Sequence, residues 1–280
     1  MFNRRYASGR GSSLMPRLII GAIIAIISLV TYFSAQVHNP VTDEVQHIDI
    51  TVEQEIALGL QAAPEMAEQY GGLDPDQSAQ ALVDRVGREL VSRTAAGGTP
   101  YQFEFYLLAD QQTINAFALP GGPVFITRAL LNRLQTEGQL AGVLGHEVGH
   151  VVARHSAEHI AKARLTEGLT GAAVIAAYDP NDPSSQQTAQ VAVLIGQLVN
   201  LKFGRDDELE SDRWGVRFMA EAGYDPRSMI TVMEILAQAS EGARPPEFFS
   251  THPNPENRIE KIQAAIAEEF PNGVPEGLQE

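Results

Sequence analysis

The sequence has 280 residues, 44% hydrophobic and 20% charged, which is enough for one full domain and excludes a chain that is disordered throughout. The formal net charge of −15 argues against nucleic acid as a partner and against electrostatic docking on anionic lipid. Because the chain contains no cysteine, disulfides, thiolate metal sites and a thiol nucleophile are excluded, and any metal ion must bind histidine and carboxylate groups.

The amino terminus contains an apolar segment, residues 18–35, close to the length of about 20 residues that a membrane span requires. Arginines precede it in residues 1–17, and acidic residues follow it. Because basic residues stay on the cytoplasmic side, we expect a single-pass anchor in the cell membrane, with the rest of the chain in the periplasm or outside the cell. A signal peptide, cleaved to release the protein into the periplasm, is the alternative. The one-sided arginines disfavour a buried core helix.

The remainder of the chain predicts mostly helices. Residues 36–50 are expected to be a polar linker, residues 51–272 one domain, and residues 273–280 a tail. Thr51 and Thr136 are each followed three residues later by glutamine, a capping box that predicts a helix start. The predicted fold class is therefore α+β and predominantly helical.

Strands are predicted in one region only. Residues 101–109 alternate between polar and apolar side chains and are rich in aromatic residues, which is typical of a strand. Residues 113–127 predict two short strands around the turn Pro120-Gly121-Gly122. A helix is expected to begin near Arg128. These strands would form one small sheet.

Several apolar and acidic segments follow a histidine-rich helix. Residues 168–178 and 189–203 are too short to span a membrane and predict core helices, or a helical flap over a cleft. An acidic helix is expected over 206–222. Asp225-Pro226 and Asn254-Pro255 predict the starts of the last two helices, because proline fits the first helical turn.

The histidine-rich helix contains the sequence GHEVGHVVARHSAEH, residues 145–159, with four of the seven histidines of the chain. His146 and His150 are four residues apart, so on a helix they share one face and can bind one ion. Glu147 is rotated by about 100° and lines the same cleft without being a ligand. This arrangement suits Zn²⁺, with Glu147 as the base that takes a proton from a water molecule.

Two alternatives apply to this helix. The pattern could occur by chance on a solvated helix, but Gly145 and Gly149 are poor helix formers and fit a site that another backbone or a substrate approaches closely. The inverted motif formed by His155, Glu158 and His159 could also bind a metal ion, but it is expected to be a solvated polar surface at the end of the helix.

A third ligand is expected from the acidic segment DDELESD, residues 206–212. Glu208 and Asp212 are four residues apart on the predicted helix. Glu208 could bind the metal ion, and Asp212 could accept the free ring N–H of a ligand histidine. An ordinary acidic surface is the alternative.

Three motifs together resemble peptidase family M48, which includes prenyl proteases, HtpX heat-shock proteases and BepA-like proteases. They are HEVGH (146–150), ELESD (208–212) and STHPNPENRI (250–259). The segment NAFALPGG (115–122) is similar to the strand that lies beside the active site in this family. The resemblance covers about residues 50–270.

The resemblance implies a compact, mostly helical zincin with one small sheet and one Zn²⁺ per chain. It implies the ligands His146, His150 and Glu208, with Glu147 as general base. The same resemblance implies supporting roles for further residues: Asp212 orients a ligand, Arg258 anchors the loop of His252, and a substrate strand adds beside Asn115, Ala116, Phe117 and Ala118.

The resemblance also implies that His252 lies near the metal ion as a catalytic residue. It either supports the oxyanion of the reaction or occupies the open metal position until it is displaced. Pro253, Asn254 and Pro255 stiffen the chain after it, although a helix-entry loop with an inert histidine would have the same sequence.

These observations predict a zinc-dependent endopeptidase that is tethered to the membrane by its amino terminus. The resemblance alone implies unfolded or damaged envelope proteins as its substrates. One alternative is a binding module, in which a latent protease fold serves as a chaperone of the cell envelope. A metal-free structural envelope protein is the other. The sequence predicts polypeptide substrates but leaves the oligomeric state open.

Overall fold

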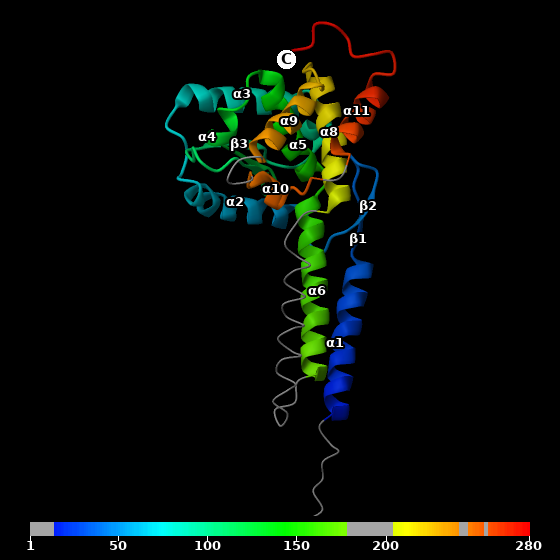
Figure 1. Cartoon of the computed structure of the whole chain (residues 1–280). Coiled ribbons are helices and arrows are strands. Elements are labelled where there is room, and N and C mark those ends of the chain that lie inside the picture. Colours follow the sequence, from blue (N-terminus) through cyan, green and yellow to red (C-terminus); the bar gives the residue numbers. More distant parts are fainter. Residues whose placement is uncertain (1–13, 178–203, 241–245, 255–256) are drawn as a thin grey trace, which may run out of the picture. The chain divides into compact units, whose positions relative to one another are not determined.

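The computed structural model describes most of the chain (Figure 1). The described residues are 14–177, 204–240, 246–254 and 257–280. Contacts divide the chain into two units: the smaller comprises residues 1–37, 46–49 and 159–201, and the larger comprises 38–45, 50–158 and 202–280.

A three-stranded sheet organises one end of the larger unit. β5 (Pro123–Thr127) is the central strand, parallel to β3 (Glu104–Leu108) and antiparallel to β4 (Ala116–Ala118). The strands thus lie where the sequence predicted them. β4 is at the edge of the sheet, and α5, the helix that carries the histidines, packs against it.

The two faces of the sheet bury different sets of apolar side chains, because successive residues of a strand point to opposite faces. Val124 and Ile126 of β5 join the main core with α3 (Gln77–Ser92), whereas Phe125 joins a smaller cluster with α2 (Val52–Gln69). In Figure 1 the strands accordingly lie between these two helices. The sheet is therefore covered on both sides.

The helix starts around the sheet follow the sequence closely. Thr51 and Gln54 exchange both bonds of a capping box at the start of α2, as predicted. Thr136 caps α5 (Glu137–Val152) by accepting from the Gln139 N–H, but the Gln139 side chain binds the N–H of Gln135 instead of closing the box. The short elements η1 (Ala95–Gly98) and α4 (Arg128–Leu131) complete this region.

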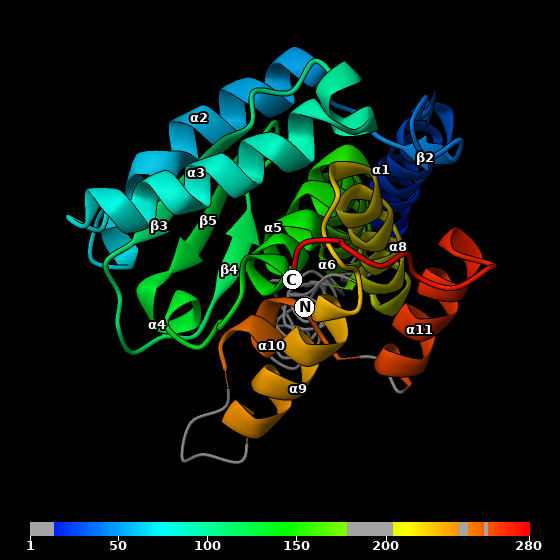
Figure 2. The same ribbon diagram turned by 90° about the horizontal axis from the view of Figure 1, so that it is seen from above.

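The central helix α5 is buried from Gly138 to Val152 and lies against α8 (Arg205–Ala222), as seen from above in Figure 2. Glycines allow the two helices to approach closely. A Cβ atom at Gly149 would lie 2.9 Å from the Ser211 carbonyl oxygen, and one at Gly145 would lie 3.4 Å from that of Gly215. The expectation that another backbone approaches these glycines is confirmed, and it brings α8 next to the histidines.

The helix that contains the histidines ends earlier than expected. Residue Arg154 has a φ of 59° and separates α5 from a second helix, α6 (His155–Ala177). Its side chain binds the carboxylate of Glu55 in an ion pair. The inverted motif therefore opens a new helix instead of ending the first one. Glu55 is ninety-nine residues away in sequence, so the local pattern could not show the break.

The carboxy-terminal helices differ from the sequence prediction at their starts. α9 spans Ser228–Ser240, a short α10 spans Phe248–Thr251, and α11 spans Arg258–Glu269. The predicted start of the last helix at Asn254-Pro255 is wrong. Asn257, with a φ of 65°, directly precedes α11, and asparagine tolerates this left-handed conformation better than most residues.

The segment 36–50 is also more than a linker, because it contains two strands that pair with each other. They are β1 (Gln36–His38) and β2 (Val45–His47). Just after β1, the buried Asn39 donates a hydrogen bond to the Val152 carbonyl at 2.8 Å. One buried amide thereby binds the last turn of α5.

The smaller unit contains α1 (Leu14–Ser34), an exposed apolar helix of 21 residues. By length and composition it is the one helix of the described residues that could cross a membrane. Within this unit α6 lies beside α1 (Figure 1), since a Cβ at Gly21 would lie 2.8 Å from the Ala172 carbonyl oxygen.

Of the two apolar segments expected as core helices or a flap, 168–178 lies largely in α6. There it is mostly half-exposed, so it is not a core helix. The other segment, 189–203, lies outside the described residues.

Candidate metal centre

The spacing of His146 and His150 on α5 places both rings in one buried cluster. The two side chains are 3% and 2% exposed, and their Nε2 atoms are 3.1 Å apart. Two ring nitrogens that face each other at this distance are well placed to bind a single cation from one side of the site.

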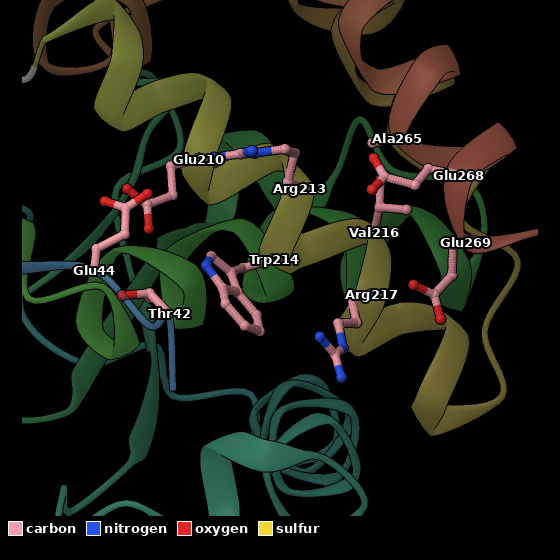
Figure 3. A pocket seen from close by; sticks show the side chains of 10 residues that line it. All are labelled: Thr42, Glu44, Glu210, Arg213, Trp214, Val216, Arg217, Ala265, Glu268 and Glu269. Atoms are coloured by element: carbon pink, nitrogen blue, oxygen red, sulfur yellow. The ribbon is translucent and has the colours of Figure 1, made fainter. Parts of the chain in front are cut away.

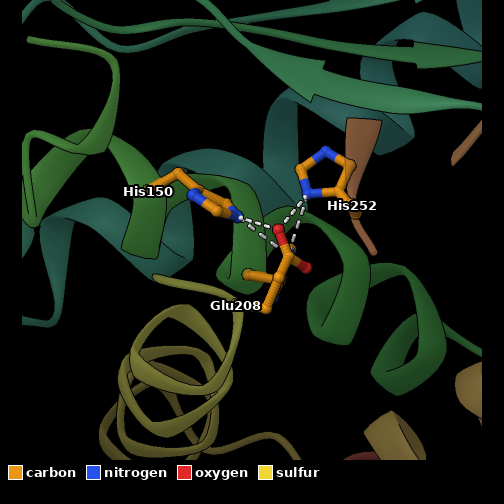
Figure 4. Close-up of side chains that lie close together, drawn as sticks. His150, Glu208 and His252 are labelled. Atoms are coloured by element: carbon orange, nitrogen blue, oxygen red, sulfur yellow. Dashed lines mark hydrogen bonds and ion pairs between the residues drawn. The ribbon is translucent and has the colours of Figure 1, made fainter. Parts of the chain in front are cut away.

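Two more side chains reach the same point (Figure 4). Glu208 of α8 brings its carboxylate to 3.5 Å from His146 Nε2 and 3.4 Å from His150 Nε2. His252, which directly follows α10, places Nδ1 3.0 Å from Glu208 Oε1 and 3.4 Å from His146 Nε2. One ligand atom from each of the four residues lies within 4.8 Å of all the others. These four residues are called the His–Glu cluster below.

Glu147 is fully buried next to this cluster. Its carboxylate lies 3.6 Å from His252 Nε2, and burial raises its pKa. Among the described residues, neither of its oxygens accepts a hydrogen bond. Glu208 Oε2 accepts none from them either, although Arg258 Nη1 lies 3.2 Å from it in an ion pair. Buried carboxylate oxygens without donors are costly, so the cluster lacks groups that it needs to be complete.

The donor set fits a divalent metal ion of the zinc type. Two imidazole nitrogens and one carboxylate are the ligands of many catalytic zinc sites, which keep a further position for water. Such an ion would satisfy Glu208, and a water molecule beside it would satisfy Glu147. The residues of this site therefore fit a metal ion of the zinc type, which is also what the buried oxygens of Glu208 and Glu147 require.

The electrostatics of His150 and Glu208 agree with this interpretation. Burial is the largest influence on His150 and lowers its pKa well below the ordinary value. Burial also acts on Glu208, but the neighbouring rings of His146, His150 and His252 outweigh it and lower the pKa of this carboxyl. An unprotonated imidazole and an ionised carboxylate are the forms that bind metal ions. At His146, burial lowers the pKa, but the carboxylates of Asp212 and Glu208 outweigh it and raise the pKa to about 9, so this ring would release a proton when it binds a metal ion.

Asp212 and Arg258 support His146 from behind. His146 Nδ1 is 2.9 Å from Asp212 Oδ1, and Arg258 donates to both oxygens of that carboxylate, at 2.7 and 2.9 Å. Burial would raise the pKa of Asp212, but the charge of Arg258 and the His146 hydrogen bond hold it at about 2. Arg258 also lies 3.2 Å from Glu208. Arg258 thus contacts the cluster itself, in addition to opening α11.

His155 is a residue of this site that sequence reasoning missed. It is 1% exposed, and its Nδ1 lies 2.9 Å from His150 Nδ1. The prediction of a solvated polar surface is therefore wrong for His155, while Glu158 and His159 are half-exposed. The helix break before His155 turns its ring towards α5, and nothing in the local pattern signalled that break.

The predicted substrate-binding strand lies close to the site. Asn115, Ala116 and Phe117 are buried, and Ala118 is partly exposed. The Asn115 amide donates to the Tyr70 hydroxyl at 3.1 Å, so at least part of its role is structural. The backbone of β4 forms the edge of the sheet next to α5.

Comparison with known proteins fits this geometry. The sequence model described as Peptidase family M48 matches residues 77–266, more than half of the chain, and this span includes both ligand-bearing helices. The chain belongs to peptidase family M48.

Relatives of this M48 chain include named proteases. It is 35% identical over 188 residues to the beta-barrel assembly-enhancing protease of Escherichia coli (strain K12), covering 63% of this chain and 37% of that protein. It is 33% identical over 254 residues to the mitochondrial metalloendopeptidase OMA1 of Schizosaccharomyces pombe, covering 89% of this chain and 72% of that protein. The chain thus spans little more than a third of the first relative's length.

Proposed function

We propose that this protein is a zinc-dependent endopeptidase. The observation that carries the proposal is the His–Glu cluster, with the buried carboxylate of Glu147 beside it. Membership of peptidase family M48 and the names of the relatives support it. His146, His150 and Glu208 would hold one zinc ion per chain.

When bound, zinc would supply electrophilic activation of the scissile carbonyl and of a water molecule. The protein groups do the rest. Glu147 takes the proton of the attacking water and delivers it to the nitrogen of the leaving amine. Its raised pKa suits both transfers, because a general base works best when its pKa approaches the working pH. Asp212 holds the His146 ring in one orientation.

The substrate backbone is proposed to add as a strand beside β4. An edge strand offers unpaired backbone groups, and extended peptides commonly bind proteins in this way. Asn115, Ala116, Phe117 and Ala118 would line this part of the cleft, because β4 packs against the helix that carries Glu147. Recognition through the backbone would allow many sequences to be cleaved.

His252 is proposed to gate the centre, with support of the oxyanion as the alternative. Its Nδ1 lies 3.0 Å from Glu208 and 3.4 Å from His146, which favours a position as a fourth ligand. The ring stacks on Phe248, whose N–H donates to the Ile114 carbonyl just before β4. The segment that carries His252 thus also lies at the proposed substrate strand, where a substrate would displace it.

The proposed substrates are unfolded or damaged proteins of the cell envelope. The apolar helix α1 supports attachment to a membrane, and the arginines before it support a periplasmic or extracellular position of the larger unit. The names of the relatives, which refer to beta-barrel assembly and to mitochondria, fit a protease that works at membranes.

The experiment is to measure zinc content and azocasein cleavage on the same purified samples of the full chain. Wild type should contain one zinc per chain and lose activity with a chelator. Glu147→Gln should keep zinc and lose activity, whereas the control Glu158→Gln, in a half-exposed residue, should keep both. Cleavage at the wild-type rate by Glu147→Gln would overturn the mechanism. Zinc without any cleavage by wild type would favour the latent chaperone.

A further inference from the structure

His150 contacts another histidine, His155, through the ring nitrogen that does not face the His–Glu cluster. The corresponding nitrogen of His146 contacts a carboxylate, that of Asp212. The His155 ring lies between His150 and the Glu210 carboxylate: its Nδ1 is 2.9 Å from His150 Nδ1, and its Nε2 is 3.3 Å from Glu210 Oε2. We propose that His155 and Glu210 form a hydrogen-bonded chain that fixes the ring orientation and tautomer of His150. This inference rests on the proposed metal site.

The direction of the hydrogen bonds follows from the chemistry of the end group. An ionised carboxylate can only accept, so Glu210 fixes the proton of His155 on Nε2. His155 Nδ1 is then an acceptor and takes a hydrogen bond from His150 Nδ1–H. That leaves His150 Nε2 with its lone pair, and this is the atom that faces Glu208 at 3.4 Å. The chain therefore presents His150 in the tautomer that binds a metal ion.

The backbone is arranged to bring His155 to this place. On one continuous helix, His155 would be rotated by about 140° from His150 and would face away from it. The left-handed conformation of Arg154 interrupts the helix and turns the next residue back. Left-handed backbone is uncommon outside glycine, and here an ion pair between Arg154 and Glu55 holds it. The break thus serves the contact between the two histidines.

Ser211 adds a second contact to the same ring. Its hydroxyl lies 3.3 Å from His155 Nδ1, and it belongs to the turn of α8 that lies between Glu208 and Asp212. One turn of α8 therefore contributes both the proposed ligand Glu208 and the carboxylate of Glu210, which ends the hydrogen-bonded chain behind His150. His155 and Glu210 are positioning residues in this scheme, because they act through His150.

Glu210 also connects the hydrogen-bonded chain of His150, His155 and Glu210 to the protein surface. Its side chain is 11% exposed and lines a pocket together with Glu44, Arg213 and Trp214 (Figure 3). The hydrogen-bonded chain thus extends from His150, a fully buried proposed ligand, to this polar pocket at the surface.

The test measures metal affinity by competition with a chelator and the absorption spectrum of the cobalt-loaded protein. His155→Leu removes the acceptor for His150 at similar volume and should weaken affinity by about 10- to 100-fold, the usual effect of losing an outer partner of a ligand. It should also shift the cobalt bands. His155→Gln can still accept through its amide oxygen and should recover most of the affinity. His159→Leu, four residues along α6, is the matched control and should behave as wild type.

Glu210→Gln provides a second arm that leaves the buried rings in place, and it should shift the cobalt spectrum with a smaller loss of affinity. Wild-type affinity and spectrum in folded His155→Leu and Glu210→Gln proteins would overturn the inference and leave the proposed function standing. Equal losses in His155→Leu and His159→Leu would also overturn it. If the wild-type protein bound neither zinc nor cobalt, both proposals would fail.

Discussion

The two histidines of the HExxH motif are one helical turn apart, yet the protein supports them differently. Behind His146 lies one carboxylate, Asp212, which the buried Arg258 binds through two hydrogen bonds. Behind His150 lies another histidine, His155, and only then a carboxylate at the edge of a pocket. One side is closed by a buried ion pair, and the other extends to the surface.

The difference implies that the site holds His146 rigidly, whereas the surroundings of His150 can adjust. The Asp212–Arg258 pair is buried on all sides, so its geometry depends on the packing of α8 against α11. The His155–Glu210 chain ends beside Glu44 and Arg213, where charges in contact with solvent act on it. We therefore expect substitutions on the closed side to affect folding and metal binding strongly, and those on the open side to affect them less.

The largest effect is expected on the closed side from Arg258→Met. This change leaves the carboxylates of Asp212 and Glu208 buried without their cation, which typically costs about 3–5 kcal/mol. Arg213→Met, on the exposed side of the same helix as Asp212, should change the free energy of unfolding by less than about 0.5 kcal/mol. Denaturant unfolding of both variants measures the difference, and equal midpoints would break the comparison.

Asp212→Asn should have the next largest effect. It keeps the size of the side chain but weakens the hydrogen bond to His146 Nδ1, and loss of such a partner lowers metal affinity by about 10- to 100-fold. Glu210→Gln should lower the affinity less, because a histidine separates it from the ligand. Chelator competition on both variants gives the ratio. A larger loss in Glu210→Gln would reverse the roles of the two sides.

His252 belongs to neither side, since it reaches the cluster from the chain that follows α10. As a gate it should be dispensable for metal binding, so His252→Ala should keep zinc and raise basal peptide cleavage on the order of tenfold, equivalent to about 1.4 kcal/mol. If the ring supports the oxyanion, kcat should instead fall by about 10²-fold. Unchanged cleavage of all peptides would remove His252 from the mechanism.

The smallest effect is expected at the outer wall of the pocket. The Arg217 guanidinium lies 5.4 Å from the centre of the Trp214 ring, and its side chain is about half-exposed. Arg217→Ala should cost less than about 1 kcal/mol of stability, the usual scale of an exposed contact between a cation and an aromatic ring. It should leave metal affinity unchanged, because Arg217 contacts none of the hydrogen-bonded residues His150, His155 and Glu210. A change of metal affinity beyond twofold would show that the pocket is coupled to the centre more tightly than the contacts indicate.

Much of the site could be predicted because its residues obey helical spacing. His146 and His150, and then Glu208 and Asp212, are pairs four apart, and such pairs share a face wherever the helix lies. Gly145 and Gly149 of α5 likewise predicted that a second backbone approaches this helix closely, and that backbone is the one of α8.

What could not be predicted depends on contacts between distant segments. The break at Arg154 depends on Glu55, and the burial of His155 depends on that break. α11 begins at Arg258, directly after Asn257 in the left-handed conformation. The pair Asn254-Pro255, a few residues earlier, is itself a helix-start pattern, and it led to the wrong predicted start. Spacing within one helix is a local property, whereas these features are set by tertiary packing.

The zinc content of Glu208→Ala, measured beside wild type and Glu158→Ala, tests the central claim most directly. Glu208 is the one carboxylate in the His–Glu cluster, and it comes from a different helix than the two histidines of the motif. We predict one zinc per chain in wild type and in Glu158→Ala, and none in folded Glu208→Ala. A full complement of zinc in Glu208→Ala would contradict the proposed centre.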